Sequence, residues 1–471
     1  MEEQRQHFLV VTFPVQGHLN PGRHLAKRLA LLAAGARITI STPISGHRRM
    51  FSSISTPDEE VQDGNITYIP FSDGDDDGSS SRNFKSYVTD LELLGSQHLA
   101  AIIRRLSDGG QPVTCVIYTL LLPWAGRVAR EHGITSVQFW IQPATILAIC
   151  YHFFHGHQSI VSAHSNDPTF RLNLPNLPTL QIRDLPTFLT ITDRDNPNFH
   201  FLSAFKDTIE AMKAGEKVLV NTFDELEPDA FGLMREHMDL VAIGPVMPPA
   251  QADASDSTPV TRDLFGEDGS RYMEWLNTQR ERSVVYASFG SNLVLKKGQM
   301  EGIRRGLMES GRPYLWAVRR EPSEIAVPDK EAAEPKTGEK GMEIEWCAQL
   351  RVLSHAALGC FVTHCGWNST AESLVSGVPV VAVGRWADQA TNAWMVEREW
   401  GVGVRAEVGK DGEVEAEEVR SCIEMVMGDG ERGLQIRRKA AMWKERAREA
   451  IGEGGSSDRN LRAFIQAIQN S

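Results

Sequence analysis

Both halves of the chain alternate short apolar, β-favouring runs with segments of helical periodicity. This alternation is typical of parallel sheets whose faces are covered by helices. With 471 residues the chain is too long for one ordinary hydrophobic core, so we expect two α/β domains. Strands are predicted near residues 7–13, 36–41, 66–71, 114–118, 136–140 and 217–221 in the first half, and near 283–288, 314–318, 342–346, 360–363 and 378–383 in the second.

A stretch rich in Pro, Ala, Asp and Ser lies near the middle of the chain. This composition is typical of a linker. We therefore predict a first domain over residues 1–245, a linker over 246–260 and a second domain over 261–450. The last segment, 451–471, contains a run with helical periodicity.

Composition and charge exclude several classes of protein. The formal net charge of -12 argues against a nucleic-acid binder. No apolar stretch has the length of a membrane span, and the polar amino terminus shows no secretory signal. The six cysteines are scattered without a C-x-x-C pair, which indicates a reducing compartment. We therefore expect a cytoplasmic protein, with a monomer as the default.

Residues 346–389 contain a compact strand–turn–helix unit. Residues 360–363 form an apolar, β-favouring run, and after a polar turn the pattern is helical over 371–376. Asn368 or Ser369 is expected to cap this helix. A helix that begins directly after a buried strand binds anions well, because its unpaired N–H groups and its dipole point the same way. The unit therefore predicts a diphosphate site.

Flanking side chains complete a nucleotide-sugar site. Trp346 could stack on a base, Glu372 could bind ribose hydroxyls, and Asp388 with Gln389 could bind sugar hydroxyls. Together with the HCGWNS core over 364–369, this long gapped pattern resembles the signature box of the plant family 1 UDP-sugar-dependent glycosyltransferases. The resemblance implies the GT-B fold, two facing Rossmann-like, doubly wound domains. It also implies a UDP-sugar on the second domain, an acceptor on the first and a carboxyl-terminal helix that returns to the first.

The resemblance further implies which residues bind the donor. Asp388, Gln389 and Trp367 favour glucose as the transferred sugar. Ala348 and Gly384 stand where the box usually has proline, and we expect only local backbone adjustments from them. The implied donor-binding residues are Ser291, Trp346, Cys347, Gln349, His364, Gly366, Trp367, Asn368, Ser369, Glu372, Asp388 and Gln389.

His18 follows the first predicted strand. Asn20 and Pro21 predict a helix start, so His18 is expected in the turn between strand and helix, at the sheet edge where such folds bind ligands. Imidazole accepts protons near neutral pH, and the surrounding motif matches the family's amino-terminal catalytic histidine. We therefore expect His18 to deprotonate the acceptor, whose attack inverts the anomeric centre.

Thr119 stands where many family members carry an Asp that orients the catalytic histidine. A hydroxyl can fix the imidazole tautomer, but it cannot stabilise an imidazolium as a carboxylate does. Three explanations stay open: Thr119 gives weaker support, another acid substitutes, or the acceptor is an acidic phenol or a carboxylate. Residues 139–145 resemble the branch that contains anthocyanin 5-O-glucosyltransferases and ester-forming relatives, in which Thr is common at this position.

The sequence therefore predicts an inverting UDP-glucose-dependent glycosyltransferase that needs no metal or other cofactor. Its acceptor is expected to be small and mostly apolar: a flavonoid phenol first, then a small carboxylic acid or a terpenoid or steroid alcohol. Gln16, Trp140 and Gln142 are expected to line the acceptor pocket. An ester-forming glucosyltransferase, a sugar-nucleotide epimerase and a non-catalytic UDP-sugar sensor are the alternatives. The acidic residues at 73–77 are expected to form a solvated loop.

Overall fold

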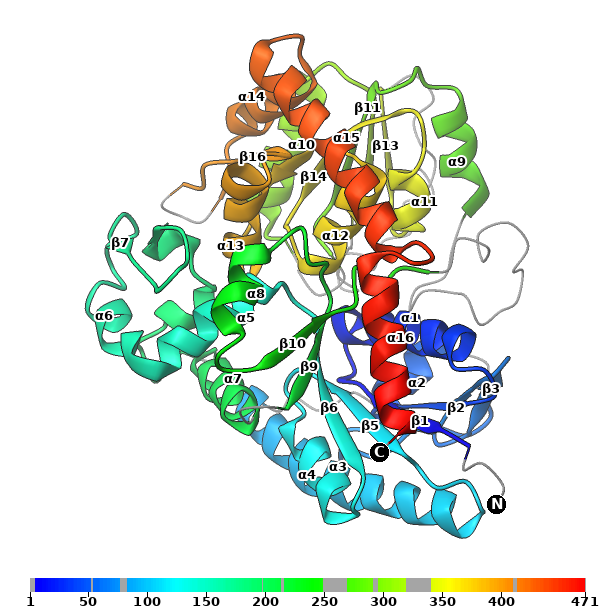
Figure 1. Ribbon diagram of the computed structural model, residues 1–471. Coiled ribbons are helices and arrows are strands. Elements are labelled where there is room, and N and C mark those ends of the chain that lie inside the picture. Colours follow the sequence, from blue (N-terminus) through cyan, green and yellow to red (C-terminus); the bar gives the residue numbers. More distant parts are fainter. Residues whose placement is uncertain are drawn as a thin grey trace. The chain divides into compact units, whose positions relative to one another are not determined.

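The chain forms two compact units in the computed structural model (Figure 1). The first unit combines Met1–Leu264 with Glu449–Ser471, and the second is Phe265–Arg448. Most of the predicted linker, residues 249–260, lies outside the described part of the chain. The residues that the structure describes are 5–51, 54–76, 83–196, 198–212, 216–248, 269–290, 295–318, 340–409 and 413–470.

An eight-stranded sheet forms the centre of the first unit, in the order β10-β9-β6-β5-β1-β2-β4-β3. All neighbouring strands run parallel except β3 and β4. Every residue of β1 and β5 is buried, as expected for central strands that helices cover on both faces. The strands are β1 (His7–Val11), β2 (Arg37–Ser41), β3 (Val61–Asp63), β4 (Ile66–Tyr68), β5 (Cys115–Thr119), β6 (Thr135–Trp140), β9 (Lys217–Val220) and β10 (Asp239–Ala242).

Helices cover this sheet and include one from the carboxyl terminus of the chain. That helix, α16 (Ser456–Gln469), belongs to the first unit. Its Ser457 Oγ donates to the carbonyl oxygen of Gly244 (2.5 Å), and Ile465 accepts a hydrogen bond from Gln6 (3.0 Å). The other helical elements are α1 (Gln16–Leu32), α2 (Ile44–Met50), α3 (Phe84–Asp108), α4 (Pro123–Glu131), α5 (Ala144–His152), η1 (Phe153–His157), α6 (Gln158–Ala163), η2 (Ile182–Asp184), η3 (Thr187–Thr190), α7 (Phe199–Ala211) and α8 (Pro228–Met234).

Helix α1 begins earlier than the sequence predicted. It starts at Gln16, and Pro21 lies inside it. The carbonyl of Val15 already accepts hydrogen bonds from the amides of His18 (2.9 Å) and Leu19 (3.0 Å). Pro21 therefore lies one turn into a helix that has already begun, and its fixed φ is compatible with helical backbone. The prediction that His18 lies in the connecting turn is wrong: it lies in the first turn of α1.

The second unit is built on a six-stranded parallel sheet, in the order β13-β12-β11-β14-β15-β16. Successive residues of a strand point to opposite faces, so Val285 and Tyr286 on β11 contribute to different apolar clusters. The strands are β11 (Val284–Ser288), β12 (Tyr314–Ala317), β13 (Gly341–Ile344), β14 (Leu358–Thr363), β15 (Val380–Ala382) and β16 (Gly403–Arg405). The helical elements are α9 (Gly269–Asn277), α10 (Lys297–Glu309), α11 (Gln349–Leu353), α12 (Trp367–Ser376), α13 (Gln389–Trp394), η6 (Met395–Glu399), α14 (Ala416–Met427) and α15 (Glu431–Ile451), whose end from Glu449 onward belongs to the first unit.

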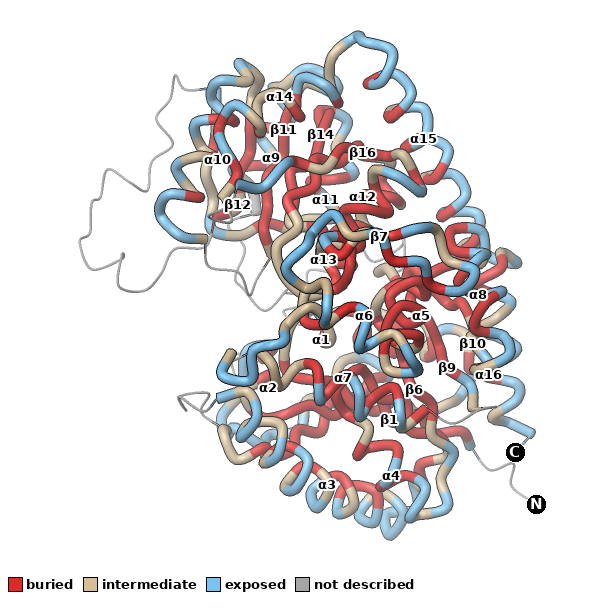
Figure 2. Tube along the Cα trace, turned by 90° about the vertical axis from the view of Figure 1, so that its left-hand side faces the viewer, coloured by how far each residue is buried: buried red, intermediate tan, exposed pale blue. Residues whose placement is uncertain are grey.

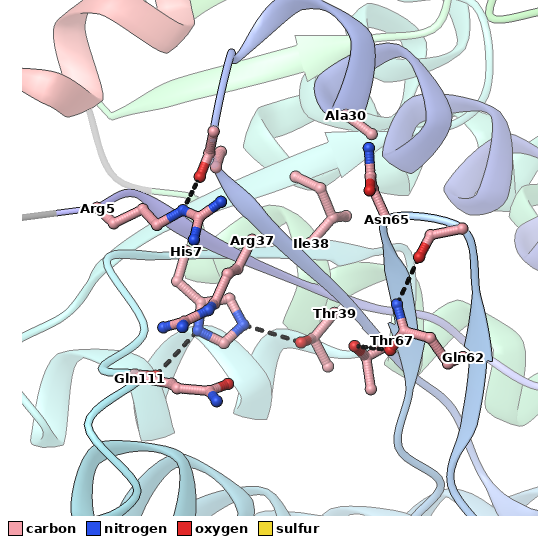
Figure 3. A pocket seen from close by; sticks show the side chains of 13 residues that line it. Arg5, His7, Ala30, Arg37, Ile38, Thr39, Gln62, Asn65, Thr67 and Gln111 are labelled. Atoms are coloured by element: carbon pink, nitrogen blue, oxygen red, sulfur yellow. Dashed lines mark hydrogen bonds between the residues drawn. The ribbon is translucent and has the colours of Figure 1, made fainter.

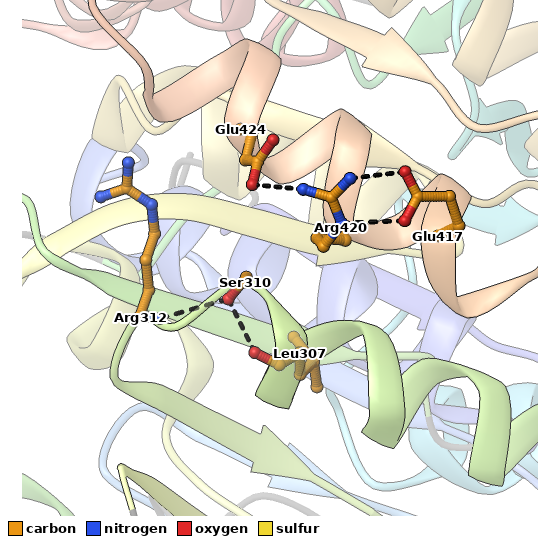
Figure 4. Close-up of polar contacts among 6 residues, drawn as sticks. All are labelled: Leu307, Ser310, Arg312, Glu417, Arg420 and Glu424. Atoms are coloured by element: carbon orange, nitrogen blue, oxygen red, sulfur yellow. Dashed lines mark hydrogen bonds and ion pairs between the residues drawn. The ribbon is translucent and has the colours of Figure 1, made fainter.

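Burial follows the same plan in both units. Buried residues concentrate on the strands and on the inner faces of the helices, while the outer helical faces are exposed (Figure 2). On α14, Arg420 bridges Glu424 (2.6 Å) and Glu417 (2.5 Å) across successive turns (Figure 4). Both glutamates are exposed and Arg420 is partly exposed, so solvent weakens the network, and the apolar inner face of α14 contributes more to its attachment than these ion pairs do.

Each predicted strand occurs in the structure within a few residues of its predicted place. Strands β3, β10 and β16 were not predicted from the sequence, nor was the small antiparallel pair β7 (Arg171–Leu172) and β8 (Leu180–Gln181). These strands have two to four residues. They carry too few apolar positions to show a strand period. In the part of the chain that is described, no helix is long and apolar enough to cross a membrane.

Candidate active site

His18 and Thr119 meet in the first unit, although they lie 101 positions apart in the chain. The reason is that β1 and β5 are neighbours in the sheet. His18 lies on α1 just after β1, and Thr119 is the last residue of β5. His18 Nδ1 lies 3.1 Å from Thr119 Oγ1, which also accepts a hydrogen bond from the amide of Phe13 (3.3 Å). The fold thus brings together both predicted catalytic residues.

The His18 ring is electrically neutral in this environment. Burial lowers the pKa of His18 to about 3. No described carboxylate contributes to this pKa, so the idea that another acid replaces the usual Asp receives no support. The Phe13 amide occupies one lone pair of Thr119 Oγ1, and the other can accept a proton from Nδ1. In that tautomer Nε2 keeps its lone pair, which a general base requires.

The three predicted acceptor-pocket residues have different surroundings. Gln16 and Gln142 are half-buried and follow β1 and β6, and each has a buried side-chain oxygen without a hydrogen-bond partner in the described structure. Trp140 is 0% exposed, and its indole N–H donates to the carbonyl of Pro143 (3.0 Å). The prediction for Trp140 is therefore wrong, because a ring with no exposed surface packs in the core and cannot contact an acceptor.

Helix α12 in the second unit begins at Trp367, with Gly366 as its N-cap. No side chain caps it, and Asn368 and Ser369 lie within its first turn. The prediction that one of them caps the helix is wrong, because the Gly366 carbonyl already accepts the first helical bond, from the amide of Thr370 (3.0 Å). The helix terminus still points its first amides at the carboxyl end of β14, which is the arrangement that binds a diphosphate.

Two glycines make room for the imidazole of His364 beside this terminus. A Cβ atom on Gly290 would lie 2.7 Å from His364 Nε2, and one on Gly366 would lie 2.6 Å from it. Gly290 also has a φ of 80°, which favours glycine. Burial lowers the pKa of His364 to about 4, so this ring is neutral. The predicted Ser291, next to Gly290 in the chain, lies outside the described residues.

Gln349 connects several of the predicted donor-binding residues. Its Nε2 donates to Ser369 Oγ (2.9 Å) and to Glu372 Oε2 (2.7 Å). Its Oε1 accepts a hydrogen bond from Tyr286 OH (3.2 Å), which also lies 3.2 Å from Cys347 Sγ. The sequence analysis missed Tyr286, which is 1% exposed. Its phenol is the one polar side chain in the interior of the apolar strand β11, and this feature of the sequence could have indicated a role in the site.

Asp388 and Gln389 lie at the start of α13. Asp388 is buried and accepts a hydrogen bond from Asn392 Nδ2 (2.8 Å), and burial raises its pKa to about 6. Gln389 Oε1 accepts hydrogen bonds from the amides of Arg385 (3.1 Å) and Trp386 (3.0 Å). Gln389 therefore retains its NH₂ group as the part that can donate to a sugar hydroxyl.

The two predicted tryptophans belong to different parts of the box. Trp346 follows β13, while Trp367 is 4% exposed and has its ring centroid 6.0 Å from that of Trp400. Trp367 can therefore contribute its backbone N–H, at the start of α12, more readily than its ring. Among the residues described, no group of three or more His, Cys, Asp or Glu residues could hold a metal ion.

The acidic cluster at 73–77 is only partly the solvated loop that the sequence predicted. Asp73 is 0% exposed and accepts hydrogen bonds from Tyr87 OH (2.7 Å) and from the amide of Asp75 (3.0 Å). Burial raises its pKa. The prediction is wrong for Asp73, because local sequence did not show that α3 brings a tyrosine hydroxyl to it; Asp77 lies outside the described residues.

Comparison with known proteins assigns the chain to a family. The family model described as "UDP-glucoronosyl and UDP-glucosyl transferase" matches residues 206–448. The chain belongs to this family. The UDP-glycosyltransferase is 46% identical to crocetin glucosyltransferase, chloroplastic, from Gardenia jasminoides, over 98% of this chain and 97% of that protein. It is 42% identical to anthocyanidin 3-O-glucoside 5-O-glucosyltransferase 1 from Perilla frutescens, over 98% of this chain and 99% of the relative.

Solved structures agree with this assignment. The UDP-glycosyltransferase matches the crystal structure of Os79 from O. sativa in complex with UDP with a TM-score of 0.82 and 33% identity, over 98% of this chain and 100% of that one. The predicted plant family, the GT-B fold and the enzyme class are confirmed.

Proposed function

We propose that this UDP-glycosyltransferase transfers glucose from UDP-glucose to a small, mostly apolar acceptor and inverts the anomeric carbon. The observation that carries the proposal is the 3.1 Å contact between His18 Nδ1 and Thr119 Oγ1. It supports a base that is held in one orientation, as proton abstraction from an acceptor requires. The names of relatives, phloretin 4'-O-glucosyltransferase from Malus domestica among them, support glucose as the sugar and a phenol as the acceptor.

The proposed reaction is a single displacement. Nε2 of His18 takes the proton from the acceptor hydroxyl as the acceptor oxygen bonds to the anomeric carbon. The bond from that carbon to the diphosphate oxygen breaks, and UDP leaves with the electron pair. The amide groups at the start of α12 and the His364 ring beside them would stabilise the negative charge on the leaving diphosphate. Because the nucleophile attacks opposite the leaving group, an α-linked donor gives a β-glucoside.

The weak basicity of His18 favours acidic acceptors. An imidazole whose pKa is about 3 takes a proton from an ordinary alcohol poorly, and a phenol with a pKa near about 10 is deprotonated far more easily. We therefore place a phenolic hydroxyl first. A carboxylate, which needs no base, is the second candidate and would give a glucose ester. Terpenoid and steroid alcohols come last on the same argument.

We also propose that the donor site works without a metal ion or other cofactor, in a cytoplasmic monomer. The helix terminus and His364 would provide the charge stabilisation for which other transferases use a divalent cation. We expect turnover to be unchanged by a chelator, and a strict requirement for Mg²⁺ would contradict the proposal.

Since one relative is named as chloroplastic, fractionation of cells that express the tagged protein tests the compartment, and light scattering tests the monomer.

The first experiment is a mass-spectrometric screen of the purified enzyme with UDP-glucose and a panel of phenols, carboxylic acids and terpenoid alcohols. His18→Ala runs beside it, and calorimetry measures UDP binding by both proteins. A product heavier by one hexose, absent with a variant that still binds UDP, supports the proposal. Loss of both properties in the variant would contradict the assigned role of His18. Binding of UDP-glucose without any product across the panel would favour a UDP-sugar sensor.

A further inference from the structure

A pocket lies in the first unit at the end of the sheet where the parallel strands begin (Figure 3). His18 and Thr119 lie at the opposite end of these strands. Its walls come from the amino ends of β1 and β2, the turn between β3 and β4, and the residues just before β5. The volume is about 350 Å³, within the range of pockets that hold small molecules. The catalytic residues lie at the carboxyl ends of the same strands, so this pocket is separate from the site described above.

Two arginine side chains give the pocket its charge. In the described structure, neither Arg5 nor Arg37 forms an ion pair with a carboxylate. Arg5 Nε donates to the carbonyl of Gly35. The guanidinium of Arg37 extends beside Gln111 and His7 (Figure 3), and within the described chain it makes no hydrogen bond. On a chain with a net charge of -12, these two cations form a local site that attracts anions.

His7 supports the pocket but does not add to its charge. The ring is buried, with Nδ1 2.9 Å from the carbonyl oxygen of Gln111 and Nε2 2.8 Å from Thr39 Oγ1. Both ring nitrogens are therefore occupied by the protein. Burial lowers the pKa of His7, so the ring is neutral. His7 thus ties β1, β2 and the segment before β5 together beneath the arginines.

We propose that this pocket binds a small phosphorylated polyol. Guanidinium groups match phosphate in charge and in geometry, because their N–H groups bind two oxygens at once. The side-chain amides of Asn65 and Gln111 line the same pocket and make no hydrogen bond within the described structure, so they can bind hydroxyl groups. A nucleotide fits less well, because His7 is the one aromatic ring in the lining and it is buried and fully hydrogen-bonded.

The test is calorimetric titration of the full-length protein with glucose 6-phosphate, inorganic phosphate and glucose. Saturating UDP is present throughout, so that the donor site cannot bind the added phosphate. We expect glucose 6-phosphate to bind, inorganic phosphate to bind more weakly and glucose to give no signal. Arg37→Gln should weaken binding of glucose 6-phosphate by about tenfold or more, because one charge-assisted contact is lost. An unchanged denaturant-unfolding midpoint of the first unit shows that the variant is folded.

Arg5→Gln should also weaken binding of glucose 6-phosphate. Arg49→Gln is its matched control, because Arg49 is likewise exposed and its Nε donates to a backbone carbonyl, that of Ser45. Equal weakening by Arg49→Gln and Arg5→Gln would overturn the proposal, since it would indicate general attraction by surface charge. Failure to bind both glucose 6-phosphate in solution and phosphoinositide vesicles in the assay below would overturn it as well.

Vesicles separate the two sources of such a ligand. Cosedimentation with phosphoinositide vesicles that is lost in Arg37→Gln would identify a lipid headgroup, while binding of glucose 6-phosphate alone identifies a free metabolite. Equal binding to phosphatidylserine vesicles, which carry charge without a phosphorylated polyol, contradicts the proposal.

Discussion

At the scale of single residues, the pair His18 and Thr119 determines what kind of base the proposed reaction would use. A carboxylate beside an imidazole stabilises the imidazolium and raises its pKa, whereas the Thr119 hydroxyl can only orient the ring. Together with burial, this leaves a histidine that is neutral over the whole physiological range. The base is correctly oriented and weak.

Thr119→Asp should make the activity sensitive to acid. The new carboxylate raises the pKa of His18, and since the neutral ring is the active form, kcat/KM should fall as the pH falls through that higher value. In the natural enzyme, titration of His18 should have no effect until the pH approaches about 3. The pH profile of kcat/KM measures this difference. Thr119→Val is the control, expected to lower kcat without moving the profile, and superimposable profiles for Thr119→Asp and the natural enzyme would refute the argument.

Asp388 should give donor binding its own pH dependence. Burial raises its pKa to about 6, so the carboxylate, which we propose accepts hydrogen bonds from the sugar, becomes protonated below that value. We expect the KM for UDP-glucose to rise as the pH falls through about 6. The affinity for UDP, which has no sugar, should not change. Asp388→Asn should remove the pH dependence, and a natural enzyme whose KM is flat across this range would contradict the assigned role.

The raised pKa of Asp388 also makes stability depend on pH, but stability should be higher at low pH, where donor binding is weaker. The folded pKa lies above the ordinary value of 3.8, so between about pH 4 and pH 6 the folded state binds the proton more tightly. The free energy of unfolding should therefore fall as the pH rises through this window, by about 3 kcal/mol at most. Urea unfolding across the window measures it, with Asp388→Asn expected to give a flatter curve.

At the scale of elements, α12 depends on glycines at both of its ends. Gly377 ends the helix with a φ of 72°, the left-handed backbone that glycine adopts without strain. Gly366 precedes the helix with an ordinary φ of -58°. Glycine is needed there because a Cβ atom would collide with the His364 ring. Both glycines can be seen in the sequence, but only the structure distinguishes the conformational reason for Gly377 from the steric reason for Gly366.

Gly366→Ala should therefore weaken donor binding without straining the backbone. Its Cβ would lie 2.6 Å from His364 Nε2, so the ring or the start of α12 must move away from its position. We expect the affinity for UDP to fall about tenfold or more, measured by calorimetry. Gly232→Ala is the control, because a Cβ there meets nothing within 4 Å, and equal UDP affinity in both variants would show that the spacing does not matter.

At the scale of the whole molecule, the first unit is completed by the last residues of the chain. Asn460 on α16 donates from Nδ2 to the carbonyl of Ala242 (2.9 Å) and to Asp224 Oδ2 (3.1 Å). Those partners lie more than two hundred positions earlier in the chain. A change on α16 should therefore affect the stability of the first unit and leave the second unit unaffected.

Asn460→Ala tests this separation. We expect the free energy of unfolding of the first unit to fall by about 1–2 kcal/mol, because two partly buried acceptors lose their donor. Denaturant unfolding measures the change, and UDP affinity should remain that of the natural enzyme. Gln466→Ala, an exposed position on the same helix, should change neither quantity. A loss of UDP binding in Asn460→Ala would show that the two units do not respond independently.

Local patterns in the sequence were sufficient for the parts of the molecule whose determinants are close together in the chain. The apolar runs of β5 and β14 are long enough to show buried strands, and the box from Trp346 to Gln389 carries the family's spacing. The glycine that ends α12 could also be recognised, because the left-handed conformation is a property of that residue itself. The fold class, the family and the places of most strands followed from such features.

Only the tertiary structure determined the contacts between segments that are distant in the chain. Nothing near Asp73 in the sequence indicates the hydroxyl of Tyr87, and nothing near Trp140 shows that Phe205 and neighbouring side chains bury it. The partnership of His18 with Thr119 likewise depends on β1 and β5 being neighbours in the sheet. Local periodicity encodes which face of an element is apolar, whereas burial, pKa and hydrogen-bond partners depend on which other elements cover that face.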